Sequence, residues 1–210
     1  MTSRIEIENW ALIYLEEDTQ TNIDNSSSGQ TIDLLYNSVY RQLLKKNTYG
    51  WTFARKIATL NQIANPPSMS NQYANAYQLP LDYLMMITPL QSFNTFRIVG
   101  KFLYTNDDSF QMLYVSTVDE SLLSDEFAHA FAYDLAARVA GKITGKQEIK
   151  QYLDYKFAMA LRNAVQLDIA QMDTQQYMPP VNAIYQSHFD GSFSVGSLAG
   201  LSSSGKSNGS

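Results

Sequence analysis

The sequence feature that most limits how this chain can fold is a stretch from residue 124 to residue 172 that contains no proline. Apolar residues recur in it every three or four positions, the spacing of one face of a helix. The larger ones are Phe127, Phe131, Leu135, Val139, Ile143, Ile149, Leu153, Phe157, Leu161 and Val165, and the surface is extended by Leu167 and Ile169. A parallel row of small side chains consists of Ala128, Ala132, Ala136 and Ala140. Gly145 is the strongest break and Gly141 a weaker one. The pattern predicts helices over about 124–143 and 147–172, paired as an antiparallel hairpin whose apolar surface the rest of the chain must help to cover.

Two further helices are predicted before this hairpin. Ser3 and Glu6 have the spacing of a capping box, and the helix that they begin is expected to end near the acidic residues 16–18. Residues 19–29 are polar and are interpreted as a loop. A second amphipathic helix is predicted over about 31–46, and its apolar face comprises Ile32, Leu35, Tyr36, Val39 and Leu43.

A turn at residues 47–50 is followed by Trp51, Thr52, Phe53 and Ala54. Each of the two aromatic side chains buries a large apolar area when it is packed in a core. We expect Trp51 and Phe53 to fill the surface of the helix hairpin. The alternative is a stacking platform for a ligand or a base, but no basic cluster or phosphate-binding loop accompanies them.

The middle of the chain has the composition of β-structure. Pro66 and Pro67 end any preceding helix, and Tyr77-Gln78-Leu79-Pro80-Leu81-Asp82 is predicted to be an extended entry into a turn. Three strands are predicted over 83–88, 96–104 and 110–116, the last two joined by a polar hairpin loop at 106–109. Together they predict one small antiparallel sheet, at about 77–118, inserted between two helical halves.

The last segment, residues 175–210, is rich in serine and glycine but retains isolated apolar and aromatic residues. We interpret it as an extended, partly disordered arm that binds a protein partner, separate from a helical domain over residues 1–174. The expected partner-binding residues are Tyr177, Met178, Pro179, Pro180, Ile184, Tyr185, Phe189 and Phe193. The alternative is a tail without a partner that folds back in part. The fold class is therefore mainly α within α+β: a helical bundle with an inserted sheet and a C-terminal arm.

Composition argues against several functions. The formal net charge is -5, which predicts no general attraction to nucleic acid or anionic lipid, and the chain has no cysteine for disulfides or zinc–thiolate sites. No apolar run reaches the length of a membrane span, and the acidic start is unlike a signal peptide. His129 and His188 are the only histidines, and neither has a second histidine or a cysteine at the spacing of metal ligands. The pair Asp107 and Asp108 is explained by turn chemistry more simply than by acid–base catalysis. We expect no catalytic residues, no cofactor and no metal.

The features in their order resemble a known family. They are the N-terminal helix and loop, the helix that ends before Trp51-Thr52-Phe53-Ala54, the Leu79-Pro80-Leu81-Asp82 turn, a hairpin over 96–105, and the helix pair carrying Ala136-Ala137-Arg138-Val139-Ala140. Over about residues 4–173 the chain is similar to the head-to-tail adaptors, or tail tubular proteins A, of short-tailed bacteriophages. The motif residues taken as structural are Trp51, Phe53, Ala54, Leu79, Pro80 and Asp82. One departure is Gly50, where we expect proline before the tryptophan.

The resemblance implies a structural virion protein without enzymatic activity. Such a protein is expected to form a ring, typically of about twelve copies, between the portal and the tail nozzle or tubular proteins, and DNA would pass through it without specific recognition. Its place would be the head–tail interface of a virion assembled in the host cytoplasm, with no membrane partner. Two other readings stay open: a non-ring helical scaffolding or interaction module whose tail binds one protein, and an enzyme with an unrecognised site.

Overall fold

The computed structural model describes residues 2–21, 26–65, 69, 71–91 and 94–172, all of which belong to the first of two units of the chain, residues 1–173. The predicted hairpin is confirmed as α3 (Asp125–Ile143) and α4 (Gln147–Ala170). Ser124 caps α3, because its side chain accepts a hydrogen bond from the backbone N–H of Phe127. Gly145 has φ +66°, which suits a residue without a side chain at the turn between the helices. α3 continues through Gly141.

The two N-terminal helices are also present, as α1 (Arg4–Tyr14) and α2 (Ser27–Leu44). The capping box of Ser3 and Glu6 is formed in both directions. The predicted start of the second helix was wrong: it begins at residue 27, not 31. Ser26 is the N-cap and accepts a hydrogen bond from Gly29, so the serine run that suggested a loop starts the helix instead. Leu35, predicted on the buried face, is 36% exposed.

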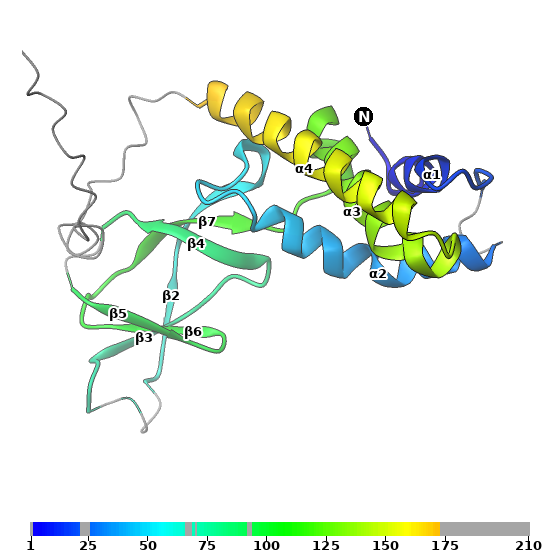
Figure 1. Cartoon of the computed structure of the whole chain (residues 1–210). Coiled ribbons are helices and arrows are strands. Elements are labelled where there is room, and N and C mark those ends of the chain that lie inside the picture. The colour runs from blue at the N-terminus through cyan, green and yellow to red at the C-terminus, as the bar shows by residue number, and fades with distance from the viewer. Residues whose placement is uncertain (1, 22–25, 66–68, 70, 92–93, 173–210) are drawn as a thin grey trace, which may run out of the picture. The chain divides into compact units, whose positions relative to one another are not determined.

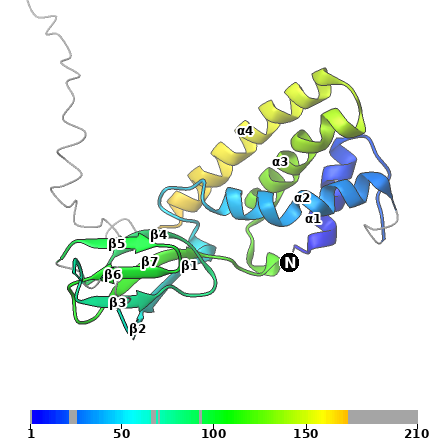
Figure 2. The ribbon, with the colours of Figure 1, turned by 90° about the horizontal axis from the view of Figure 1, so that it is seen from below.

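The helical core is centred on α3, which contacts each of the other three helices. Figure 2 shows α4 on one side of α3 and both α1 and α2 on the other. Both apolar rows of α3 are therefore buried. The row of alanines is fully buried, and the larger side chains beside it, Phe127, Phe131 and Leu135, are fully buried as well. Among the described residues, α4 is covered on one side only, and Leu153 and Ala164 are its buried apolar residues.

In the part of the chain that the structure describes, seven strands and two short 3-10 turns lie between α2 and α3 (Figure 1). The turns are η2 (Thr52–Ala54) and η3 (Glu120–Leu122). The strands are β1 (Arg55–Thr59), β2 (Asn61–Ile63), β3 (Asn75–Gln78), β4 (Tyr83–Pro89), β5 (Phe96–Val99), β6 (Phe102–Thr105) and β7 (Gln111–Ser116). They form two antiparallel sheets, in the orders β1-β7-β4 and β2-β3-β6-β5.

The predicted single sheet was wrong in three respects. β1, β2 and β3 were not among the predicted strands. The single strand expected over 96–104 is a hairpin of β5 and β6 that turns at Gly100, as the family resemblance implied. The loop at 106–109 is not a hairpin loop, because β6 and β7 belong to different sheets.

β7 joins the helices to the second sheet by the alternation of its side chains. Val115 belongs to the helical core, whereas Met112 and Tyr114 belong to a separate core with Leu60, Tyr77, Leu79, Leu103 and Phe110. The first sheet is thus a shared layer with one face toward the helices and the other toward the second sheet. This arrangement buries both faces of β7, which a lone hairpin could not do.

Candidate functional site

The described residues contain no group of three or more His, Asp or Glu side chains that could hold a metal ion, and no described helix is long and apolar enough to cross a membrane. His129 is an exposed residue of α3, as expected of a helix-surface residue. It stacks on Trp10 at 4.3 Å between ring centroids, and its Nδ1 lies 3.0 Å from the hydroxyl of Tyr14. Tyr14 in turn stacks on Tyr133 at 4.1 Å, so the four aromatic rings join α1 to α3.

Trp51 is fully buried and joins three elements. Its indole N–H donates to the carbonyl of Leu43 at 3.2 Å, which satisfies the polar end of a buried ring. The Trp51 ring contacts Phe127 edge to face at 4.9 Å, and Phe53 contacts the same phenylalanine at 5.1 Å. The prediction that both aromatic residues fill the surface of the hairpin is confirmed. Ala54 is also buried, and its carbonyl accepts a hydrogen bond from Ser116 in β7.

The turn before Trp51 explains the glycine at position 50. Gly50 has φ +72°, a conformation closed to proline, whose ring holds φ near about −65°. A Cβ atom there would also lie 2.6 Å from Cδ1 of Ile87 and 3.0 Å from Cγ2 of Val115. The expected proline therefore does not fit this turn.

Asp168 of α4 holds the same turn from the other side, and the sequence analysis did not predict this contact. One of its carboxylate oxygens accepts from the backbone N–H of Thr52 at 2.9 Å and from the Thr52 hydroxyl at 2.6 Å. The other accepts from the side-chain amide of Asn47 at 3.1 Å, and this amide also donates to the carbonyl of Gly50 at 3.1 Å. We call Asp168, Asn47 and Thr52 the α4 clamp. It ties the C-terminal part of α4 to the junction between helices and sheets.

The second motif, Leu79-Pro80-Leu81-Asp82, lies at the turn between β3 and β4. Leu79 is buried in the second core, and the carbonyl of Pro80 accepts from the backbone N–H of Tyr83 at 3.1 Å. Asp82 accepts from Lys56 of β1 at 2.7 Å and from the hydroxyl of Tyr114 of β7 at 3.0 Å.

These two partners change the titration of Asp82. Burial opposes ionisation of its carboxyl, but the hydrogen bonds from Lys56 and Tyr114 outweigh burial and hold the pKa of Asp82 below its ordinary value. Burial, followed by the neighbouring Asp82 carboxylate, raises the pKa of Tyr114 to about 12. The motif residues Leu79, Pro80 and Asp82 therefore contribute to core packing, a turn and a cross-strand contact. Their roles in the fold are structural.

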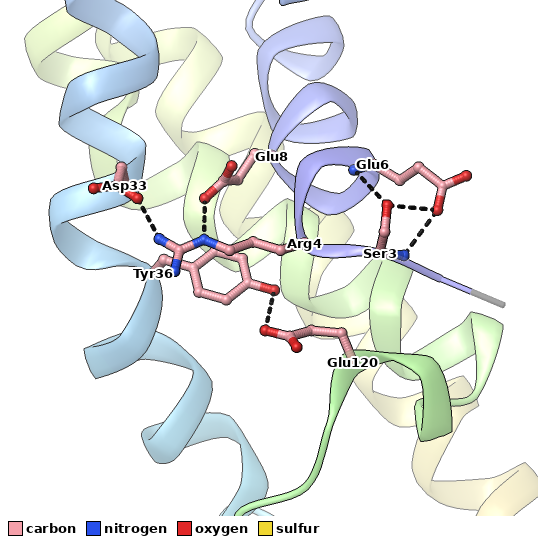
Figure 3. A network of polar contacts seen from close by, with 7 residues as sticks. All are labelled: Ser3, Arg4, Glu6, Glu8, Asp33, Tyr36 and Glu120. Carbon is pink, nitrogen blue, oxygen red and sulfur yellow. Dashed lines mark hydrogen bonds and ion pairs between the residues drawn. The ribbon is translucent and has the colours of Figure 1, made fainter. Parts of the chain in front are cut away.

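A third polar network joins α1, α2 and η3, and it too was missed from the sequence (Figure 3). Arg4 donates to Glu8 at 2.9 Å, pairs with Asp33, and lies 4.3 Å above the ring of Tyr36. The Tyr36 hydroxyl donates to Glu120 at 3.3 Å, and burial together with that carboxylate raises the pKa of Tyr36. Glu8 is only 1% exposed, so the guanidinium of Arg4 serves to offset a buried charge.

Of the elements that the structure describes, α4 carries the most exposed large apolar side chains. The exposed side chains are Tyr152, Tyr155, Met159, Leu167 and Ile169. Spacings of three and four place Tyr152, Tyr155 and Met159 on one side of the helix. Exposed apolar side chains grouped in this way are typical of an interaction surface. Only Leu167 and Ile169 were noted in the sequence, because periodicity marks an apolar face without showing whether it is covered.

The partner-binding residues predicted in the arm, from Tyr177 to Phe193, and the second histidine, His188, lie outside the described residues. A comparison of the chain with models of known protein families found no matching family, and a comparison with curated proteins found no match.

Proposed function

We propose that the protein is a head-to-tail adaptor of a short-tailed bacteriophage, a structural subunit of the ring that joins the portal to the tail. The observation that carries the proposal is the ordered set of sequence motifs over about residues 4–173. Among them, the Trp51 and Leu79-Pro80-Asp82 motifs occupy defined structural positions, at the junction of helices and sheets and at a turn between strands.

Two features of the fold support a role in assembly. α4 has exposed apolar residues on its outward side, and a subunit of a ring needs lateral surfaces for its two neighbours. α3 is buried on both sides and the α4 clamp fixes the end of α4, so the hairpin is a rigid support for such surfaces. In this proposal residues 175–210 form the arm that reaches toward the portal.

The test is assembly with the portal protein of the same phage. Purified protein is mixed with preformed portal rings and examined by electron-microscopy class averages and by native mass spectrometry. We expect a ring-on-ring complex with a fixed cyclic stoichiometry. A complex of low, non-cyclic stoichiometry would support the alternative, a helical interaction module that binds one protein, and the absence of any complex would reject the adaptor role.

A further inference from the structure

Two outward surfaces of opposite charge flank α3. We call Tyr152, Tyr155, Lys156 and Met159 of α4 the basic face, and Ile13, Glu16, Glu17 and Asp18 at the end of α1 the acidic face. Tyr155 is 62% exposed and Ile13 is 52% exposed. Glu16, Glu17 and Asp18 are exposed as well. α4 lies on one side of α3 and α1 on the other (Figure 2), so the two faces belong to opposite sides of the helical layer.

Both faces lie at the same level along α3. Because α3 and α4 form an antiparallel hairpin that turns at Gly145, Tyr155 lies ten residues after the turn and is level with the α3 residue ten before it, Leu135. The end of α1 is held at this level by Tyr14, which stacks on Tyr133 at 4.1 Å.

The chemistry of the two faces is complementary. The basic face has an ammonium group beside two tyrosines, with Lys156 Nζ 5.3 Å from the ring centroid of Tyr152. Its neighbours Lys150 and Asp154 form an ion pair at 2.6 Å, and the exposed Glu148 and Arg162, one turn beyond either end of the face, carry opposite charges, so these neighbours add no net charge. The acidic face carries three exposed carboxylates within five residues of an exposed isoleucine. Apolar contact gives such a surface affinity, and opposite charges at its edge set orientation and partner choice.

We propose that the basic face of one copy of the chain docks on the acidic face of the next copy, head to tail. The inference rests on the proposed ring and names the surfaces that build it. A contact between two different surfaces is heterologous, so it propagates around a circle or along a helix. Because both faces lie at one level of α3, successive copies need no shift along the helix axis, and a fixed rotation between copies would close the assembly as a ring.

A second acidic surface is excluded by the same geometry. Leu122, which is 58% exposed, lies with Asp119, Asp125 and Glu126 at the start of α3. This start is about eleven residues of α3 away from the level of Tyr155, or roughly 16 Å at 1.5 Å per residue. Docking of the basic face there would displace each copy along the axis, and the product would be an open filament.

Engineered cysteines test the pairing directly, because the chain contains no cysteine of its own. The single variants are Tyr155→Cys, Ile13→Cys and Leu122→Cys. They are assembled on portal rings, each alone and in pairs, and are then oxidised and separated under non-reducing conditions. We expect dimers when Tyr155→Cys is mixed with Ile13→Cys, and a ladder that stops at the ring copy number when both changes are in one chain. Cross-linking of Tyr155→Cys with itself or with Leu122→Cys would overturn the pairing.

Electron microscopy of the same samples separates this inference from the proposed function. If rings form on portals but positions 155 and 13 do not cross-link, the pairing is overturned and the adaptor role stays intact. The cross-link without portal binding leaves the pairing and rejects the adaptor role.

Charge reversal gives an independent readout. Lys156→Glu should raise the protein concentration needed for half-assembly several-fold, and the added change Glu17→Lys should restore it. Lys101→Glu, an exposed reversal between β5 and β6, is the matched control and should assemble as the wild type does. Wild-type assembly by Lys156→Glu would overturn the proposal.

Discussion

The substitution Asp168→Asn is the sharpest test of how the helix hairpin is joined to the sheets. Asp168 is 6% exposed and accepts three hydrogen bonds, two from Thr52 and one from Asn47. An asparagine has one acceptor oxygen. If that oxygen keeps the two hydrogen bonds from Thr52, the new NH₂ group faces the NH₂ group of Asn47, and a buried donor loses its acceptor.

The cost follows from these contacts. An unsatisfied buried donor costs about 1–3 kcal/mol, and the remaining hydrogen bonds are weakened because the acceptor has lost its charge. We therefore expect the free energy of unfolding to fall by about 2–4 kcal/mol. At 2–4 °C per kcal/mol for a chain of this size, the melting temperature should fall by roughly 4–16 °C.

Urea denaturation followed by tryptophan fluorescence, which comes from the buried Trp51 and from Trp10, measures this change. Asp154→Asn is the matched control: it is on the same helix, and its ion pair with Lys150 is exposed, so its loss should cost about 0.3–0.5 kcal/mol. Thr52→Val and the double variant complete a cycle that should show coupling between Asp168 and Thr52. Equal urea midpoints for Asp168→Asn and Asp154→Asn would refute the clamp.

Three other predictions concern the turn, acid stability and the arm. Gly50→Ala should lower the free energy of unfolding by about 1–3 kcal/mol, because it strains a backbone with positive φ and crowds Ile87; calorimetry that finds no change would contradict this. Asp82 has a pKa below its ordinary value. Its ion pair with Lys56 therefore contributes stability at pH values above the unfolded pKa of about 4, and this stability is lost as the pH falls through the lower folded pKa. Wild type should therefore exceed Asp82→Asn in stability at pH 7, and the difference should shrink on acidification; a constant difference across pH would argue against the lowered pKa. Deletion of residues 175–210 should leave the circular dichroism spectrum and melting temperature of the folded domain unchanged but weaken binding to portal rings, and unchanged binding would reject the arm.

The four helices were predictable because their signals are local. The step of four from Phe127 to Val139, the capping box of Ser3 and Glu6, and the break at Gly145 all involve residues within one or two turns of each other. The start of α2 was missed for a related reason. A serine run followed by glycine favours both a loop and an N-cap, and only the helix that follows distinguishes them.

The strands were harder because each is short and has little preference of its own. β1 and β2 gain stability only by pairing with β7 and β3, which follow them by many residues. Long-range pairing also divides the strands between two sheets, and the alternation along β7 assigns Val115 to one core and Tyr114 to the other. No period within the segment shows which core a side chain enters.

By itself, the sequence determined the helix hairpin, its capping and turn residues, and an order of motifs that resembles a phage adaptor. Tertiary structure alone decided that Glu8 and Asp168 are buried with polar partners, that Gly50 needs a positive φ, and that α4 keeps its tyrosines exposed. The physical reason is the range of the interactions. Helix periodicity and capping depend on neighbours within about four positions, whereas burial and polar pairing depend on residues that only the folded chain brings together, such as Asp168 and Thr52.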